Sequence, residues 1–200
     1  MPSVLLSPSS GLPLVKRIFD IVLASMFFIV FSFPMLIIAL LVKTTSKGPV
    51  LYWSDRVGRN NALFRMPKFR SMKTDTLPVA THLLSDPDRY ITPIGKWIRK
   101  TSFDELPQIL SVLKGDMSFV GPRPALFNQD DLVTLRTSKG IHTLVPGITG
   151  WAQINGRDEL PIPVKVDYDL HYLENRSFVF DLKILMLTLS NVVAGKGVTH

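Results

Sequence analysis

The chain has 200 residues, enough for one domain with a sizeable core, or for one domain and an anchor. It has no cysteine, which excludes disulfides and thiolate metal sites, and its four histidines have no metal-ligand spacing. The formal net charge of +7 indicates an anionic partner, such as phosphates, anionic lipid or nucleic acid. The mean hydropathy of +0.23 is high for a chain with 20% charged residues and predicts a local apolar segment.

The N-terminal region divides into a short tail and a long apolar segment. Residues 1–13 are rich in serine, proline and glycine, and we expect them to be flexible. Residues 14–47 form the apolar segment, and residues 21–42 within it carry no charge. A helix of this length would cross a hydrocarbon core of about 30 Å. Its length and the lack of a small-residue cleavage site argue against a signal peptide.

Two features of residues 14–47 leave a spanning helix and a re-entrant helix as open alternatives. Basic residues flank both ends, so charge gives no preferred orientation across a membrane. Pro34 lies inside the run and predicts a kink, because proline removes a backbone hydrogen bond. The Ser32 hydroxyl could satisfy a carbonyl that the proline leaves free. A helix bent there could enter one leaflet and return to the same side.

The region after this segment predicts two strands and a loop. Residues 50–53 predict a short strand, and residues 63–73 alternate apolar and basic side chains, which predicts a strand with one cationic face. That face, which includes Lys68 and Arg70, fits a solvated edge strand or a surface that binds phosphate or lipid headgroups. Residues 74–89 are polar and form a candidate lid.

Residues 90–100 predict a short amphipathic helix that begins near Thr92-Pro93. Its apolar side chains share one face, and Arg99 is one of the basic side chains beside that face. The pattern suits a helix on a membrane surface and a helix packed on a protein core equally well.

The stretch 101–124 combines an acidic pair, an apolar helix and a rigid turn that contains an arginine. Asp104 and Glu105 stand where the helix should begin. They suit capping, with Ser102-x-x-Glu105 as a capping box or Asp104 as the N-cap. They also place two carboxylates near the arginine of Gly121-Pro-Arg-Pro124. Spacing alone favours capping by about two to one.

The C-terminal third predicts a glycine-rich loop and two helices. Residues 144–157 hold glycines that let the backbone approach a ligand closely, with Asn155 in a turn and Arg157 at its tip. Residues 164–175 predict a packed helix, and residues 178–193 a helix that is buried or lies at an interface. The sequence has no P-loop and no dinucleotide-binding fingerprint.

Several long blocks of the sequence, in their order, resemble a known family. These blocks are Lys16-Arg-Ile-Phe-Asp20, Lys68-Phe-Arg-Ser-Met72, Asp104-Glu-Leu-Pro-Gln108, Lys114-Gly-Asp-Met-Ser-Phe-Val-Gly-Pro-Arg-Pro124 and Pro146-Gly-Ile-Thr-Gly-Trp-Ala-Gln-Ile-Asn-Gly-Arg157. From about residue 16 to residue 195 the chain is similar to the bacterial sugar transferases, the monotopic phosphoglycosyl transferases. Its length looks like the minimal catalytic form of that family.

The resemblance implies a reaction and a location. Such enzymes move a sugar-1-phosphate from a UDP-sugar to a polyprenol phosphate, commonly undecaprenyl phosphate, and release UMP. The step begins the assembly of a glycoprotein, O-antigen, capsule or exopolysaccharide on the cytoplasmic face of the bacterial inner membrane. Inner-membrane lipid is therefore an expected partner and nucleic acid is not, while a homo-oligomer is left open.

The resemblance also implies roles for individual residues. Asp104 matches the nucleophile that takes the phosphosugar covalently, and Glu105 matches a residue that holds Mg²⁺, with Asp104 as a further ligand. The residues expected to bind the substrates are Lys68, Arg70, Arg99, Arg123, Pro124, Asn155 and Arg157. The anchor of the family is a helix-break-helix with serine directly before proline, whereas here Phe33 stands between Ser32 and Pro34.

The sequence thus predicts a helix-rich α+β fold in three parts. A flexible N-terminus covers residues 1–13, a re-entrant membrane helix-break-helix covers 14–47, and a small cytosolic catalytic domain covers 48–200, with amphipathic surface helices and short strands. The alternative function is a non-catalytic membrane-anchored module that binds anionic lipid or nucleic acid. The substitution Asp104→Asn separates the two, because only the enzyme should lose function.

Overall fold

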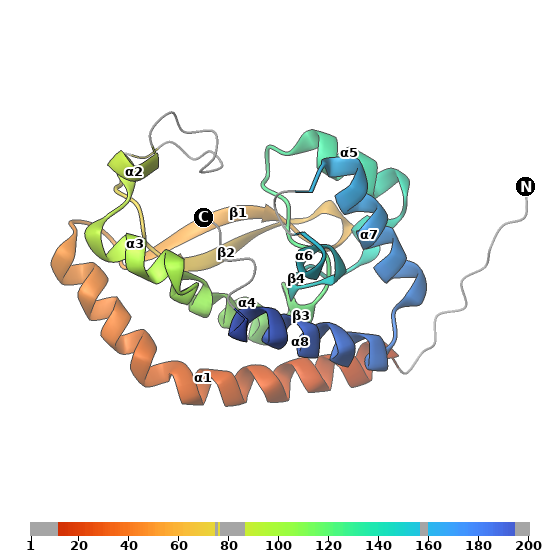
Figure 1. The fold of residues 1–200 in the computed structure, drawn as a ribbon, viewed down its shortest axis with the longest axis horizontal. Coiled ribbons are helices and arrows are strands. Elements are labelled where there is room, and N and C mark those ends of the chain that lie inside the picture. The colour runs from red at the N-terminus through yellow and green to blue at the C-terminus, as the bar shows by residue number, and fades with distance from the viewer. Residues whose placement is uncertain (1–11, 75, 77–86, 157–159, 195–200) are drawn as a thin grey trace, which may run out of the picture.

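The computed structural model describes residues 12–74, 76, 87–156 and 160–194 (Figure 1). In chain order the elements are α1 (Leu12–Thr45), β1 (Leu51–Val57), η1 (Arg59–Asn61), β2 (Leu63–Phe69), α2 (Pro87–Tyr90), α3 (Pro93–Lys100), η3 (Phe103–Gln108), α4 (Ile109–Lys114), β3 (Ser118–Val120), α5 (Asp130–Ser138), η4 (Ile141–Thr143), β4 (Gly147–Thr149), α6 (Trp151–Ile154), α7 (Ile162–Asn175) and α8 (Phe178–Val193), where η marks a 3-10 helix. The prediction of a helix-rich α+β fold with a long apolar N-terminal helix and short strands is confirmed.

The longest element, α1, lies along one side of the molecule and bends toward its C-terminal end (Figure 1). Its segment Leu14–Thr45 is long and apolar enough to cross a membrane. The helix continues through Pro34, and the Ser32 hydroxyl donates a hydrogen bond to the carbonyl of Ile29 at 2.8 Å. Pro34 deprives a different carbonyl, that of Val30, of its usual donor. The serine therefore does not satisfy the carbonyl that the proline leaves free.

Both ends of α1 are bound to the same globular unit. Near its start, Lys16 pairs with Asp181 of α8 at 2.6 Å, and Arg17 donates to two carbonyls of α4 at 2.6 and 2.7 Å. One turn on, the buried Asp20 accepts a hydrogen bond from a backbone N–H of β3 at 3.1 Å. At the other end, Arg70 donates to carbonyls directly after α1. These contacts hold both ends of the helix against the domain, whereas Ile29, Val30 and Phe33 in its middle are exposed.

Two small sheets carry the loops of the candidate site. Strands β1 and β2 form an antiparallel hairpin in which Leu51 pairs with Phe69. Strands β3 and β4 are parallel, with Ser118 opposite Gly147. The end of β1 contacts the loop after β3. The N–H of Val57 donates a hydrogen bond to the carbonyl of Ala125 at 3.0 Å.

The predicted single cationic face of residues 63–73 is wrong. Arg65 and Lys68 project to opposite faces of β2, because side chains alternate along a strand. Arg65 lies 5.4 Å from the ring centroid of Trp53, whereas Lys68 pairs with a carboxylate of the acidic pair. Arg70 follows the strand and is buried at the end of α1. The basic side chains of this stretch therefore lie in three separate places: against Trp53, beside the acidic pair and at the end of α1.

The hydrophobic core of the described residues has two clusters, and the smaller one joins α1 to the acidic pair. Ile38 and Val42 of α1 pack with Phe69 and Ile98 in this cluster. The side chains that flank the acidic pair, Phe103 and Leu106, pack against it. Full burial of each such side chain contributes about 1.5–3 kcal/mol. The larger cluster lies among α4, β3, α5, α7 and α8.

The three helices predicted for the outer parts of the domain are confirmed. Helix α3 begins after Thr92, whose hydroxyl accepts a hydrogen bond from the N–H of Gly95 at 3.0 Å. Helices α7 and α8 lie where residues 164–175 and 178–193 predicted them. Ile184 of α8 is buried, and the opposite face of α8 is apolar and exposed, at Val179, Met186 and Leu189.

Candidate active site

The acidic pair lies on the 3-10 helix η3 and caps no helix. Ser102, the residue before η3, has a φ of 56°, and its side chain makes no capping hydrogen bond. The next α-helix begins only at Ile109. Both capping alternatives for Asp104 and Glu105 are therefore wrong, and the pair must be explained by its contacts.

Asp104 is a buried carboxyl, with 8% of the residue exposed. Burial raises its pKa from an ordinary 3.8 to about 6, and the nearby Glu105 charge adds to the rise. Lys68, Arg99 and the backbone N–H of Asp104 lower the pKa, with Lys68 the strongest of these. At neutral pH the group is a carboxylate that has lost much of its hydration, which favours reaction with an electrophile that arrives with neutralising charge.

Glu105 joins the acidic pair to two of the cations. Its Oε1 atom lies 2.7 Å from Nζ of Lys68 and 3.9 Å from Nη2 of Arg123. Strand β2 packs directly on η3, which places Lys68 over the pair. Three cationic side chains, Lys68, Arg99 and Arg123, thus surround two carboxylates. This excess of positive charge suits an anionic ligand such as a diphosphate.

The loop that carries Arg123 is fixed through its backbone by two other arginines. Arg136 donates to the carbonyl of Arg123 at 2.8 Å, and Arg56 donates to the carbonyl of Pro124 at 3.2 Å. Arg136 is itself bound to the buried Asp169 by two hydrogen bonds of 2.9 and 2.6 Å. Because the loop backbone is held on both sides, the Arg123 side chain can be aimed at Glu105.

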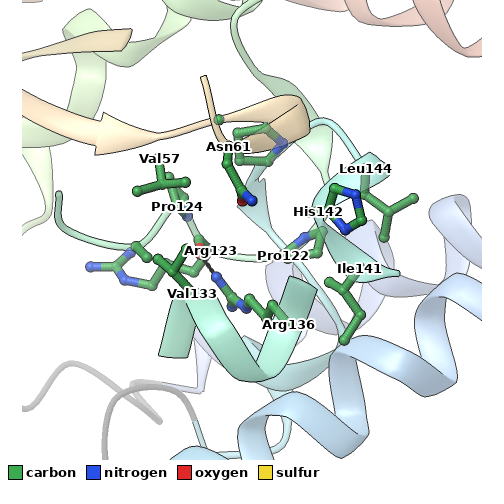
Figure 2. Close-up of a pocket in the computed structure, with 13 residues that line it drawn as sticks. Val57, Asn61, Pro122, Arg123, Pro124, Val133, Arg136, Ile141, His142 and Leu144 are labelled. Carbon is green, nitrogen blue, oxygen red and sulfur yellow. Dashed lines mark hydrogen bonds between the residues drawn. The ribbon is translucent and has the colours of Figure 1, made fainter. Parts of the chain in front are cut away.

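A small pocket lies behind this loop (Figure 2). Asn61 and His142 border it from opposite sides, and Pro122 closes one wall. The Arg123 side chain extends away from the middle of the pocket (Figure 2). The cavity volume is about 30 Å³.

For three other predicted substrate-binding residues, the structure shows contacts elsewhere in the fold or gives no description. Arg70 is buried and donates to Ser46 at the end of α1, a structural contact. The exposed Asn155 donates to the carbonyl of Trp151 in its own helix at 2.8 Å. Arg157 lies outside the described residues, as does most of the candidate lid at 74–89.

Three residues that support the site were missed by the sequence analysis. Arg56, Arg136 and Asp169 lie outside every block that carries the family resemblance. A lone arginine in a polar helix and a lone aspartate in an amphipathic one give no signal, because only the tertiary contact between them reveals their role. The one hint in the sequence is that an arginine and an aspartate of opposite charge stand on two helices of the same domain.

The acidic pair has the right chemistry for a hard divalent cation. Among residues 12–74, 76, 87–156 and 160–194, no cluster of three or more histidine, aspartate or glutamate side chains could hold a metal. Mg²⁺ needs fewer protein ligands, since it is usually held by one or two carboxylates together with waters and substrate phosphates. Asp104 and Glu105 fit that donor set.

Comparison with known proteins decides the family. A family model described as bacterial sugar transferase matches residues 12–195. The chain belongs to this family. The match covers α1, both sheets and the acidic pair of the transferase.

Three relatives illustrate the range of the family. The transferase is 42% identical to the uncharacterized sugar transferase EpsL of Bacillus subtilis (strain 168), covering 92% of this chain and 90% of EpsL. It is 40% identical to the UDP-glucose:undecaprenyl-phosphate glucose-1-phosphate transferase of Escherichia coli (strain K12), covering 92% of this chain and 41% of that protein. It is 38% identical to the UDP-N-acetylgalactosamine-undecaprenyl-phosphate N-acetylgalactosaminephosphotransferase of Aeromonas hydrophila, covering 96% of this chain and 47% of that protein. The chain therefore spans less than half the length of the last two relatives.

Proposed function

We propose that the transferase moves a sugar-1-phosphate from a UDP-sugar to undecaprenyl phosphate and releases UMP. The observation that carries this proposal is the buried Asp104 carboxylate among Lys68, Arg99 and Arg123, in a chain whose relatives are named for this reaction. Both substrates are phosphate esters, and arginine and lysine side chains bind phosphate oxygens well. The product would begin the assembly of a polysaccharide or related glycoconjugate.

Asp104 is the nucleophile of the first step. One of its carboxylate oxygens attacks the phosphorus that bears the sugar, and a new oxygen–phosphorus bond forms. The bond from this phosphorus to the bridging oxygen of the diphosphate breaks, and UMP leaves with the electron pair. The carboxylate splits one difficult transfer between two anions into two easier steps.

The second step regenerates the enzyme. A phosphate oxygen of undecaprenyl phosphate attacks the same phosphorus, and the bond to Asp104 breaks to give the free carboxylate and undecaprenyl diphosphate sugar. Lys68 and Arg123 hold Glu105 beside the reacting group, and Arg99 adds positive charge near the phosphates. Mg²⁺, held by Asp104 and Glu105 with substrate oxygens, would supply neutralisation of phosphate charge.

The anchor is proposed to be re-entrant, at the cytoplasmic face of the inner membrane. Lys16 and Arg17 at one end of α1 and Ser46 at the other end all bind the same globular unit. A straight spanning helix would place these ends on opposite sides of the bilayer. Because the chain has no cysteine, Leu14→Cys and Lys47→Cys provide single labelling sites. Neither should react with an impermeant maleimide in intact spheroplasts, and both should react after lysis; labelling of one before lysis would show a spanning helix.

The reaction itself is tested by UMP release. Purified protein would be incubated with Mg²⁺ and a panel of UDP-sugars, with and without undecaprenyl phosphate. One UDP-sugar should give continuous UMP release with the lipid and a single equivalent per protein without it, because the first step alone releases UMP. Asp104→Asn should give neither.

Two outcomes would contradict the proposal. Folded protein that releases no UMP from any donor, yet binds anionic vesicles, would favour a membrane-anchored binding module. Continuous release that requires the lipid but shows no single equivalent in its absence would rule out the covalent intermediate and favour direct transfer.

A further inference from the structure

The side-chain amide of Gln153 is buried at both ends. Neither its Nε2 nor its Oε1 atom has a hydrogen-bond partner among the residues that the structure describes. Within the described residues this is the only side chain with both an orphaned donor and an orphaned acceptor; Arg70 and His142 each leave one nitrogen unsatisfied. Swapping the two ends of the amide would not help, since both are orphaned. Buried polar groups almost always have partners, so such an amide calls for an explanation.

The position of Gln153 links it to the arginine loop. Gly150 packs so closely on Gly121 that an added Cβ would lie 2.2 Å from the Gly121 carbonyl oxygen. The same Cβ would lie 2.7 Å from Oε1 of Gln153, so the amide lies beside the contact between Gly150 and Gly121. Gly121 is two residues before Arg123, a distance of about 7 Å along extended backbone. Gln153 therefore lies near the root of the loop whose tip faces Glu105.

The chemistry of the amide selects the part of the donor that it can bind. A neutral group with one donor and one acceptor side by side is a poor phosphate ligand, because phosphate oxygens only accept hydrogen bonds and prefer cations. It matches the edge of a base such as uracil, where N3–H lies beside a carbonyl oxygen. Amide side chains pair in this bidentate way with base edges elsewhere.

We infer that Gln153 reads the uracil of the nucleotide donor, with Oε1 accepting from N3–H and Nε2 donating to an adjacent uracil carbonyl. The inference rests on the proposed function, because it assumes a UDP-sugar donor. The diphosphate then extends from the base subsite toward Arg123 and the acidic pair. The protein leaves the amide unsatisfied in its free form, and the ligand supplies the two missing hydrogen bonds.

The test is a comparison of two ligands on two proteins. UMP and 3-methyl-UMP, which lacks the N3–H donor, would be titrated calorimetrically into detergent-solubilised wild type and Gln153→Met. Wild type should bind 3-methyl-UMP at least tenfold more weakly than UMP. Gln153→Met should bind UMP at least tenfold more weakly than wild type does and should not distinguish the two ligands. The coupling between the two changes isolates the contact.

A matched control separates binding from folding. Gln129 is partly buried like Gln153, but its Oε1 accepts a hydrogen bond from the N–H of Leu126 at 2.8 Å. Gln129→Met should lower the melting temperature and leave UMP affinity unchanged. Gln153→Met should show the reverse, with a melting temperature equal to or above wild type, because an apolar side chain replaces an unsatisfied amide.

The failures of the two proposals are distinguishable. If Gln153→Met still discriminates UMP from 3-methyl-UMP as wild type does, the base subsite lies elsewhere, while the proposed reaction stands. A fall in melting temperature with unchanged UMP affinity would assign Gln153 to a water-bridged structural role and would also overturn the inference. A wild type that binds no UMP would overturn the subsite together with the UDP-sugar donor.

Discussion

Two buried aspartates of the transferase have opposite surroundings. Asp169 accepts two hydrogen bonds from Arg136, at 2.9 and 2.6 Å. Within the described part of the chain, no cation lies within 4.0 Å of the Asp104 carboxylate, although Lys68 and Arg99 act on it from farther away. Burial raises the pKa of both carboxyl groups.

The difference separates a structural carboxylate from a reactive one. Oδ2 of Asp169 accepts both of these hydrogen bonds, and the donor, Arg136, also holds the backbone of the Arg123 loop. Asp104 keeps a high pKa and leaves its oxygens available to an incoming phosphorus. We therefore expect changes at Asp169 to affect folding first and changes at Asp104 to affect chemistry first.

The largest expected effect is on turnover. Asp104→Asn should lower kcat by at least about 10³-fold, equivalent to about 4 kcal/mol, because an amide cannot form the phosphosugar adduct. The protein should remain folded, since the substitution removes a buried charge. The measurement is UMP release with the preferred donor and undecaprenyl phosphate, alongside a thermal melt.

The control for this prediction is Asp167→Asn, an exposed carboxylate that pairs with Lys139 at 2.6 Å. It should leave kcat within about twofold, as surface pairs contribute little. Equal turnover by Asp104→Asn and wild type would show that Asp104 is not the nucleophile. Asp104 would then be a structural carboxylate like Asp169.

The next effect is on stability. Asp169→Asn should lower the free energy of unfolding by about 3–5 kcal/mol, because it leaves the Arg136 guanidinium buried without its counter-charge. Urea unfolding in detergent, followed by circular dichroism, measures this change. Activity should fall as well, through the loosened Arg123 loop.

A double variant sharpens this prediction. Arg136→Met with Asp169→Leu removes the buried ion pair altogether and should restore much of the stability lost in Asp169→Asn. Its kcat should stay low, because the Arg123 carbonyl has lost its donor. Full activity in this double variant would show that Arg136 does not position the loop.

The contribution of Asp104 to the pH dependence of stability is isolated by comparing wild type with Asp104→Asn. The folded-state pKa of about 6 exceeds the unfolded value of 3.8, so folded protein binds the proton more tightly. This contribution to stability is fully present below pH 3.8 and is lost as the pH rises through 6. The loss amounts to about 3 kcal/mol. Asp104→Asn should therefore be more stable than wild type by about that amount at pH 8, and the difference should vanish near pH 4.

Part of this site could be predicted because its residues lie in uninterrupted sequence blocks. The contact of Glu105 with Lys68 and Arg123 unites three such blocks. The shape of the acidic segment could not be predicted from spacing. The segment that holds the acidic pair and Pro107 is a 3-10 helix, and the α-helix begins only at Ile109.

Sequence reasoning also failed to separate residues of equal chemistry. Lys68 and Arg70 belong to one basic run, yet the first faces Glu105 and the second is buried against Ser46. Strand β2 ends at Phe69, and the path of the chain beyond it depends on where α1 ends. Which of the two cations faces the carboxylates is thus decided by tertiary contacts and not by the local sequence.

The smallest effect concerns Lys68, which tunes Asp104 from a distance. Lys68 lowers the Asp104 pKa more than any other group does, so Lys68→Met should raise that pKa above its present value of about 6. The acid limb of the kcat/KM profile should move to higher pH, and the rate at pH 7 should fall by roughly tenfold. The matched control is Lys114→Met, which removes an exposed lysine paired with Asp116 and should not move the limb. If Lys68→Met lowers kcat/KM equally at every pH, Lys68 acts on the substrate phosphates and the Asp104 carboxylate is tuned by burial alone.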